Sequence, residues 1–130
     1  MLLDSQNLFS ENQEITSGTI YSQNIIDFGK NDVSFVPIII QAVSNFSNLS
    51  SLGVQIQTSE TSDFTEYVEL AQSKLTLEQL KEGVKFPIKF LPQGNKGFMR
   101  LAFVVEGSSE TTGKITAGVV ASDGLASHEI

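Results

Sequence analysis

The sequence predicts an all-β protein built as an antiparallel β-sandwich. Short apolar segments recur along the chain and are separated by clusters of turn-forming residues. The segment Phe98–Glu106 is apolar on both of its faces, with Arg100 as the one polar break before its end. Such a segment is typical of a central strand whose two faces are covered. At 130 residues the chain is long enough for one domain with its own core.

The leader and the domain body differ in pattern. Residues 1–16 carry scattered apolar anchors without a period of 2 or 3.6, which predicts an extended N-terminal arm. A single sandwich domain is expected at residues 17–130, because no linker-like segment divides them.

The first half of this domain holds three expected strands. They are residues 19–28, 33–43 and 53–58. The second includes Phe35 and is apolar enough for burial on both faces, although Pro37 removes one hydrogen-bond donor. The third alternates Val54 and Ile56 with glutamines, as a half-buried strand requires.

The second half holds four expected strands and one helical turn. The strands are residues 67–70, 84–91, 98–106 and 114–122. Thr76, Gln79 and Gly83 are spaced as a capping box and a stop, which predicts a helix of one or two turns. Lys85, Pro87 and Lys89 alternate with apolar residues along segment 84–91, which is typical of a protected sheet edge. The last two strands are expected to form a pair joined by the polar loop 107–113.

The composition of the chain disfavours several classes of ligand and site. Fifteen acidic and eight basic residues give a net charge of −7, which disfavours nucleic acid and anionic membranes as ligands. No apolar run approaches the ~20 residues that span a bilayer, and the start of the chain has no signal-peptide pattern. The chain has no Cys, which excludes disulfides, thiolate metal sites and thiol nucleophiles.

The sequence shows no specific catalytic motif. Its single histidine, His128, lies two residues from the end, so a Ser-His-Asp triad or a multi-histidine metal site is not expected. Two groups of carboxylates lie close in sequence without a calcium-loop pattern, and we expect them to be solvated loop residues. They are Asp27 with Asp32, and Asp63 with Glu66 and Glu69. We therefore expect a protein that is not an enzyme, with no catalytic residue, cofactor or metal.

Arg100 is the residue with the strongest claim to a role. A charge in an apolar central strand is costly unless it is paired. Two hypotheses remain open: a structural ion pair within the domain, or a side chain that reaches a partner subunit. A separate use of such a fold is carbohydrate binding. Aromatic side chains are the usual platforms for sugars, but the chain has no Trp and only two tyrosines, Tyr21 and Tyr67.

Four segments of the chain resemble one known family. They are residues 1–16 (MLLDSQNLFSENQEIT), 77–83 (LEQLKEG), 98–103 (FMRLAF) and 112–118 (TGKITAG). Their order and spacing are similar to those of the Bbp16-like capsid cement proteins of tailed bacteriophages. The resemblance implies a jelly-roll-like sandwich on the outer surface of the virion head. It also implies assembly in the host bacterial cytoplasm, contacts that clamp subunits of the major capsid protein, and a homo-oligomer, either a dimer or a trimer.

The resemblance carries over no functional residue, so the candidate interface rests on the sequence itself. The residues proposed for the capsid or self-interface are Leu2, Leu3, Leu8, Phe9 and Arg100. The apolar anchors of the leader either contact the capsid or pack on their own sandwich. The function expected first is that of a capsid cement protein, and the alternative is a carbohydrate-binding module on a virion.

Overall fold

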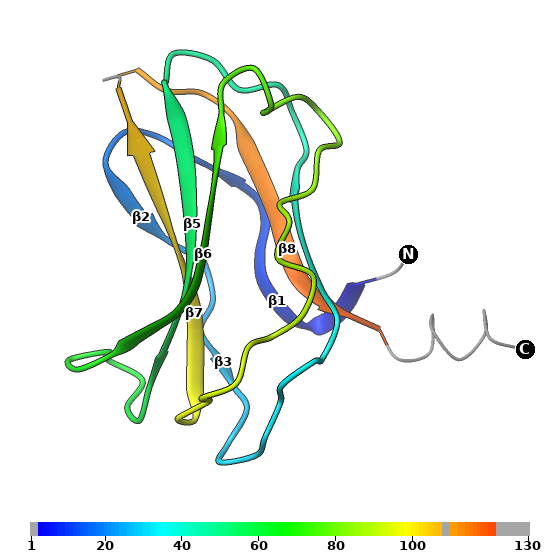
Figure 1. Ribbon diagram of the computed structural model, residues 1–130, viewed down its shortest axis with the longest axis vertical. Helices are drawn as coiled ribbons and strands as arrows, with labels where there is room; N and C mark the ends of the chain where they lie inside the picture. Colours follow the sequence, from blue (N-terminus) through cyan, green and yellow to red (C-terminus); the bar gives the residue numbers. More distant parts are fainter. Residues whose placement is uncertain (1–2, 108–109, 122–130) are drawn as a thin grey trace, which may run out of the picture.

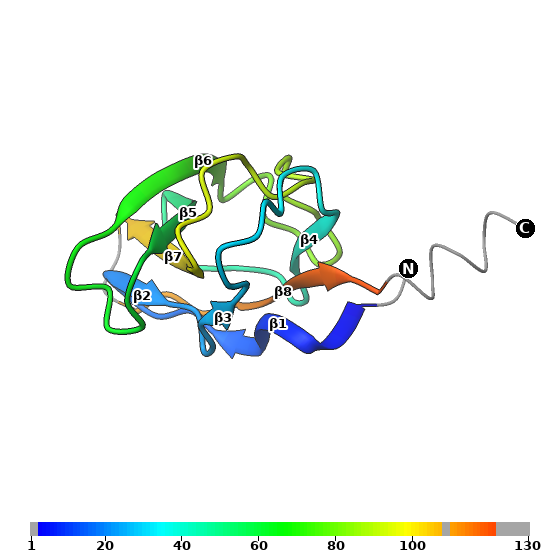
Figure 2. The same ribbon diagram turned by 90° about the horizontal axis from the view of Figure 1, so that it is seen from below.

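Two facing antiparallel sheets form the part of the chain that the computed structural model describes, residues 3–107 and 110–121 (Figures 1 and 2). The antiparallel sandwich expected from the sequence is confirmed. Its strands are β1 (Leu3–Glu14), β2 (Thr19–Tyr21), β3 (Ile26–Asp27), β4 (Ile38–Ala42), β5 (Ser51–Ser59), β6 (Val68–Thr76), β7 (Phe98–Glu106) and β8 (Lys114–Val120).

The strand order is that of a jelly roll. Sheet A runs β1-β8-β4, and sheet B runs β2-β7-β5-β6 with β3 also paired to β7. Residues 84–91 follow the free edge of β4, because Phe86 N donates to Ile40 O at 2.8 Å and Ile38 N donates to Lys89 O at 2.9 Å. When β2 and β3 count as one interrupted strand, every connection in the described chain crosses between sheets except the β5–β6 hairpin. This alternation is the jelly-roll connectivity.

Strand β7 has the bounds expected from the sequence and lies inside sheet B, between β5 on one side and β2 and β3 on the other. Met99, Leu101 and Phe103 point into the sandwich and are completely buried. The expected pairing of β7 with β8 is wrong, because β8 lies in sheet A. The chain between them crosses from one sheet to the other, and alternation within each strand cannot reveal that step.

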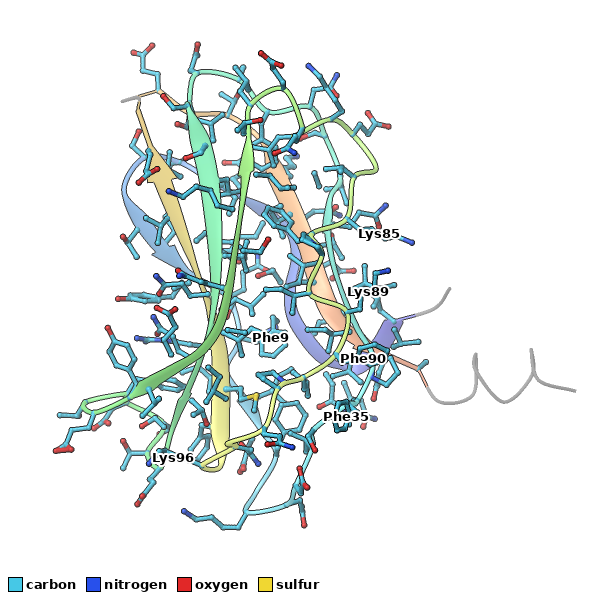
Figure 3. The ribbon with its side chains drawn as sticks, in the orientation of Figure 1. Phe9, Phe35, Lys85, Lys89, Phe90 and Lys96 are labelled. Atoms are coloured by element: carbon cyan, nitrogen blue, oxygen red, sulfur yellow. The ribbon has the colours of Figure 1, made fainter. Side chains whose placement is uncertain are left out.

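The segment expected to form an extended N-terminal arm is extended, and it is part of sheet A. Residues 3–14 form β1, an edge strand of sheet A that pairs with β8 from Leu3↔Val120 to Glu14↔Lys114. Three register shifts interrupt this pairing, so the apolar residues of β1 do not alternate. That irregularity explains why the sequence shows no strand period here. Phe9 is completely buried in the core (Figure 3).

The expected helix after Thr76 does not form, and none of residues 3–107 and 110–121 lies in a helix. The local contacts of a capping box are nevertheless present, since Gln79 Oε1 accepts a hydrogen bond from Thr76 N at 2.9 Å. Thr76 is the last residue of β6, and Leu80 is completely buried. Gly83 N already donates to Ala42 O at 2.8 Å, so the chain has room for a turn only.

Several further strand boundaries differ from expectation. The strand expected at 19–28 is divided into β2 and β3, and residues 84–91 form isolated bridges rather than a strand. The strand expected at 33–43 is limited to β4, and Phe35, which was expected to be buried, is 71% exposed. The short strand expected at 67–70 is the beginning of the nine-residue β6. In these last two places the hydrogen-bonding partner sets the strand length: β8, which is distant in sequence, for β4, and the neighbouring strand β5 for β6.

Candidate functional site

The outer face of sheet B carries one charged side chain surrounded by aromatic rings. Arg100 projects from β7, and its Cζ lies 3.8 Å from the ring centroid of Tyr21, 4.3 Å from that of Phe64 and 5.3 Å from that of Tyr67. These distances are within the range of cation–π attraction. We call Arg100 and these three aromatic residues the Arg100 cluster.

Three separate parts of the chain build the Arg100 cluster. Tyr21 is the last residue of β2, opposite Ala102 on β7, which places it beside Arg100 on the same face. Phe64 belongs to the β5–β6 loop, and Tyr67 directly precedes β6. Tyr21 is 44% exposed and Tyr67 is 47% exposed, whereas Phe64 is only 4% exposed. The cluster therefore combines a buried ring with two accessible ones.

The β5–β6 loop is held over this face by hydrogen bonds to one carboxylate. Asp63 Oδ1 accepts from Thr61 Oγ1 at 2.6 Å and from Thr65 N at 3.1 Å. These bonds to Thr61 and Thr65 favour the charged form and lower the pKa of Asp63 to about 2. Between these contacts Phe64 adopts a φ of 52°, a left-handed conformation that is unfavourable for a bulky residue. Burial of the Phe64 ring against Arg100 offsets that cost.

Gln57 supplies the polar contact beneath the guanidinium. Arg100 Nε donates to Gln57 Oε1 at 2.8 Å, and Gln57 Nε2 donates to Gln55 Oε1 at 3.1 Å. Gln57 lies directly opposite Arg100 in the β5–β7 register and is 3% exposed. Because an unsatisfied buried amide is costly, this pair fixes the position of Arg100 on the sheet.

A shallow hollow continues this face beyond the Arg100 cluster. Its lining includes Gly53 and Gln55 of β5, Lys74 of β6, and Val104 and Glu106 of β7. The absence of a side chain at Gly53 creates the depression. Lys74 Nζ and Glu106 Oε1 form an exposed ion pair at 2.9 Å at its margin, and the Lys74 hydrogen bond lowers the pKa of Glu106. The hollow has polar and apolar lining but no reactive group.

The structure decides one of the two hypotheses about Arg100. No carboxylate within residues 3–107 and 110–121 lies in ion-pair range of its guanidinium, so the expected structural ion pair is wrong. Aromatic rings and the Gln57 amide take the place of an acid. Among the described residues, the rings of Tyr21 and of Phe64 from the β5–β6 loop lie over Arg100 on the outer face of β7, and not a third layer of strands.

The apolar anchors of the leader are distributed over different environments. Leu2 lies outside the described residues, as does His128. Leu3 is half-buried, and Phe9 packs in the core, where it is unavailable to a partner. Leu8 is half-buried against Gly118, where an added Cβ would lie 2.7 Å from Leu8 Cδ2. Leu3, Leu8 and Phe9 belong to β1 of sheet A and Arg100 to β7 of sheet B, so these four residues do not form one site.

The three aspartates among the acidic residues singled out from the sequence accept hydrogen bonds from nearby residues in turns. Asp27 Oδ1 accepts from Gly29 N and Asp32 Oδ1 from Ser34 N, both at 2.9 Å, and the Ser34 bonds lower the pKa of Asp32. Across the described ranges, no three acidic or histidine side chains gather as a metal site. Likewise, no helix found there is long and apolar enough to cross a membrane.

Sequence reasoning missed Phe64, because it lies in a Ser-, Thr- and acid-rich segment that predicts a solvated loop. No local signal marked its burial, because single apolar residues are often exposed in surface loops. Tyr21 and Tyr67, considered only as sugar platforms, are brought together by the fold around one guanidinium.

The fold and this surface define an antiparallel jelly-roll sandwich with a Tyr- and Arg-bearing face. The sequence model of the Bbp16 family matches residues 9–119, so the chain belongs to the Bbp16 family, a family of bacteriophage proteins. No curated protein matches the chain. The matched range includes all of the Arg100 cluster and every strand except the first six residues of β1 and the last residue of β8.

Proposed function

We propose that this protein is a non-enzymatic capsid cement protein that binds the outer surface of a phage head and stabilises contacts between major capsid subunits. Membership of the Bbp16 family supports a role in the virion. The observation that carries the proposal is the Arg100 cluster, in which two exposed tyrosines flank an arginine on a sheet face that no other layer covers. Tyrosine and arginine are the residues most enriched at the energetic centres of protein interfaces.

The physical basis of such a function is mass action. A protein that binds the assembled shell, but not its separated subunits, lowers the free energy of the shell by RT ln(1 + L/Kd) per site, where L is its free concentration. The Arg100 cluster is suited to this because Gln57 and Phe64 hold the guanidinium in place before binding. A side chain that is already ordered loses little conformational entropy in the complex.

Cosedimentation with undecorated heads tests the proposal directly. Wild-type protein should pellet with heads at a fixed stoichiometry per major capsid subunit. Tyr67→Ser removes an exposed ring and should weaken binding by roughly tenfold or more. Arg100→Met should weaken it further. Lys30→Ser, which changes an exposed residue outside the Arg100 cluster, is the matched control.

Two results would contradict the proposal. One is a wild-type protein that does not bind heads at all. The other is head binding that Tyr67→Ser and Arg100→Met leave unchanged while circular dichroism shows both variants folded. That second result would remove the Arg100 cluster from the interface.

Carbohydrate binding is the second candidate, because Tyr21 and Tyr67 expose two rings on the same face. Sugars stack on such rings, and a neighbouring arginine donates hydrogen bonds to their hydroxyls. A glycan array separates the two functions. Saturable glycan binding that Tyr67→Ser abolishes, together with no affinity for heads, would place carbohydrate binding first.

A further inference from the structure

A second surface lies on the other sheet, at the edge formed by residues 84–91. Figure 3 shows Lys85, Lys89, Phe90 and Phe35 following one another along this side of the molecule. Phe35 N donates to Leu91 O at 2.9 Å, and Pro37 pairs with Phe90, so the two phenylalanines come from adjacent backbone segments. We call Phe35, Lys85, Lys89 and Phe90 the Phe35 surface.

The two phenylalanines leave much of their rings in water. Phe35 is 71% exposed and Phe90 is 51% exposed. Phe35 also has a φ of 67°, the left-handed region in which glycine or asparagine is favoured. Nothing in the described chain covers its ring to offset that strain. Backbone strain retained beneath an exposed apolar side chain points to a use for that side chain.

The apolar area continues from this edge across the outer face of sheet A. Ile38 and Ile40 point into the core, so the half-buried Ile39 between them faces outward. Ile39 is paired with Gly118, and Leu8 lies over Gly118 from the other side. Phe90 therefore ends a row of aliphatic side chains rather than standing alone. A row of this kind is a common feature of protein docking sites.

The charges on the Phe35 surface are opposite in sign to those of the whole chain. The net charge is −7, yet Lys85 and Lys89 are both exposed, and neither has a carboxylate within ion-pair distance among residues 3–107 and 110–121. A local positive potential on an acidic protein selects for an acidic partner. Pro87 lacks a backbone donor between these lysines, which disfavours the addition of another strand. The partner must then contact side chains rather than extend the sheet.

We infer that the Phe35 surface docks an acidic protein segment that carries apolar side chains, with Lys85 and Lys89 contacting its carboxylates and Phe35 and Phe90 its apolar groups. If the proposed function holds, this segment belongs to the head, and the two opposite sheets give the protein two contacts of different chemistry. A second contact then forms at high effective concentration once the first is made. The surface itself does not depend on that identification.

The experiment uses charge-matched double variants of the full chain. Lys85→Glu/Lys89→Glu reverses two charges on the Phe35 surface, and Lys30→Glu/Lys114→Glu makes the same net change elsewhere. Two probes are used: undecorated heads, and a labelled peptide in which Asp and Glu alternate with Leu, compared with its lysine counterpart. We expect the first variant to lose affinity for both probes by roughly tenfold or more, and the second to lose much less. The wild-type affinity should also fall as salt is raised.

Phe35→Gly separates binding from folding. Glycine accepts the left-handed backbone, so the Tm should stay unchanged or rise, while affinity for heads and peptide should fall by roughly tenfold. A fall in both Tm and affinity would assign Phe35 to folding and overturn its role in docking. Equal binding by the wild type and Lys85→Glu/Lys89→Glu would overturn the whole surface.

Other outcomes of these binding experiments would change the proposed function or the proposed partner. Peptide binding without head binding would keep the Phe35 surface and remove the proposed function, whereas head binding that depends on Tyr67 but not on the lysines would do the reverse. A DNA duplex could bind with the same affinity as the acidic peptide and lose that binding in Lys85→Glu/Lys89→Glu. In that case the surface would bind polyanions in general and not an acidic protein in particular. A lysine-dependent change of mass in sedimentation velocity would replace it by a second copy of this chain.

Discussion

Two phenylalanines with the same unfavourable backbone conformation have opposite environments. Phe64 has a φ of 52° and is 4% exposed, while Phe35 has a φ of 67° and is 71% exposed. The ring centroid of Phe64 lies 4.3 Å from Arg100 Cζ, so this ring is covered by a residue of the same chain. The ring of Phe35 projects into solvent from the turn that precedes β4 (Figure 3).

The comparison shows that local strain is informative only together with burial. At Phe64 the cost of a left-handed backbone is offset within the molecule, so its presence needs no partner. At Phe35 no such compensation exists in the described residues. The two loops also share a device, since an aspartate accepts nearby backbone donors in each, Asp63 from Thr65 N and Asp32 from Ser34 N. The difference therefore lies in what each ring touches.

The largest difference is expected from removing the two rings. Phe64→Ala should destabilise the protein by about 3 kcal/mol, because a buried aromatic side chain and its contact with Arg100 are lost. Phe35→Ala should change stability by less than about 0.5 kcal/mol, because most of its ring is already in water. Urea unfolding of both variants measures this. Equal losses would break the comparison.

Arg100→Met tests the contact that holds Phe64. Gln57 would lose its donor while 97% buried, and the three rings would lose their cation, so we expect a loss of about 2 kcal/mol. Arg100→Lys should lose less, because it keeps the charge but not the planar group. A double-mutant cycle with Phe64→Ala should show coupling, since the two residues touch. Strictly additive losses would contradict a shared cluster.

A pH dependence should distinguish the two loops. Hydrogen bonds to Thr61 and Thr65 lower the folded-state pKa of Asp63 to about 2, below its unfolded value. This stabilisation is present above the unfolded pKa and is lost as the pH falls through the folded pKa. The stability difference between wild type and Asp63→Asn should therefore shrink between about pH 4 and pH 2.

Asp32→Asn is the matched control for this titration. Hydrogen bonds from Ser34 also lower the pKa of Asp32, but the turn that Asp32 supports carries the exposed ring of Phe35. We expect Asp32→Asn to leave the near-ultraviolet signal of the tyrosines unchanged, whereas Asp63→Asn should alter it because Tyr67 lies beside the same loop. An unaltered signal in Asp63→Asn would mean that the loop does not depend on Asp63.

The smallest effect is expected from relieving strain at Phe35. Phe35→Gly should raise the free energy of unfolding by up to about 1 kcal/mol. This gain is the backbone strain that is removed minus the cost of glycine's greater freedom in the unfolded chain. The same change at Phe64 should lose stability, because the buried ring disappears. Thermal unfolding of the pair gives the sign directly. A loss at both positions would mean that the exposed ring has partners in its own fold.

Much of the fold could be predicted from the sequence because β7 and β5 have strong local patterns. Seven apolar positions interrupted only by Arg100 are hard to place anywhere but inside a sheet, and Val54 and Ile56 alternate cleanly with glutamines. Strand β1 could not be predicted, since its register shifts remove the period, and the turn after Thr76 has the same capping signal as a helix. In both cases the deciding interaction comes from a segment distant in sequence.

The candidate site was predicted only in part. Arg100 was singled out because a charge interrupts an apolar strand, but its aromatic partners come from β2 and from the β5–β6 loop. No local pattern indicates that these segments meet. Phe35 was expected to be buried because it lies in an apolar segment of the sequence. Only the tertiary structure shows that the backbone turns outward at this residue.

The pairing of β1 with β8 has a consequence for how the sandwich forms. Leu3 lies opposite Val120, so sheet A cannot close until nearly all of the described chain has left the ribosome. The β5–β6 hairpin, in contrast, needs only a local turn and can form first. Because non-local pairings set the rate, folding is expected on a scale of milliseconds to seconds. Until β8 arrives, Phe9 and the core face of β4 stay open, and apolar surface exposed in this way is prone to aggregation.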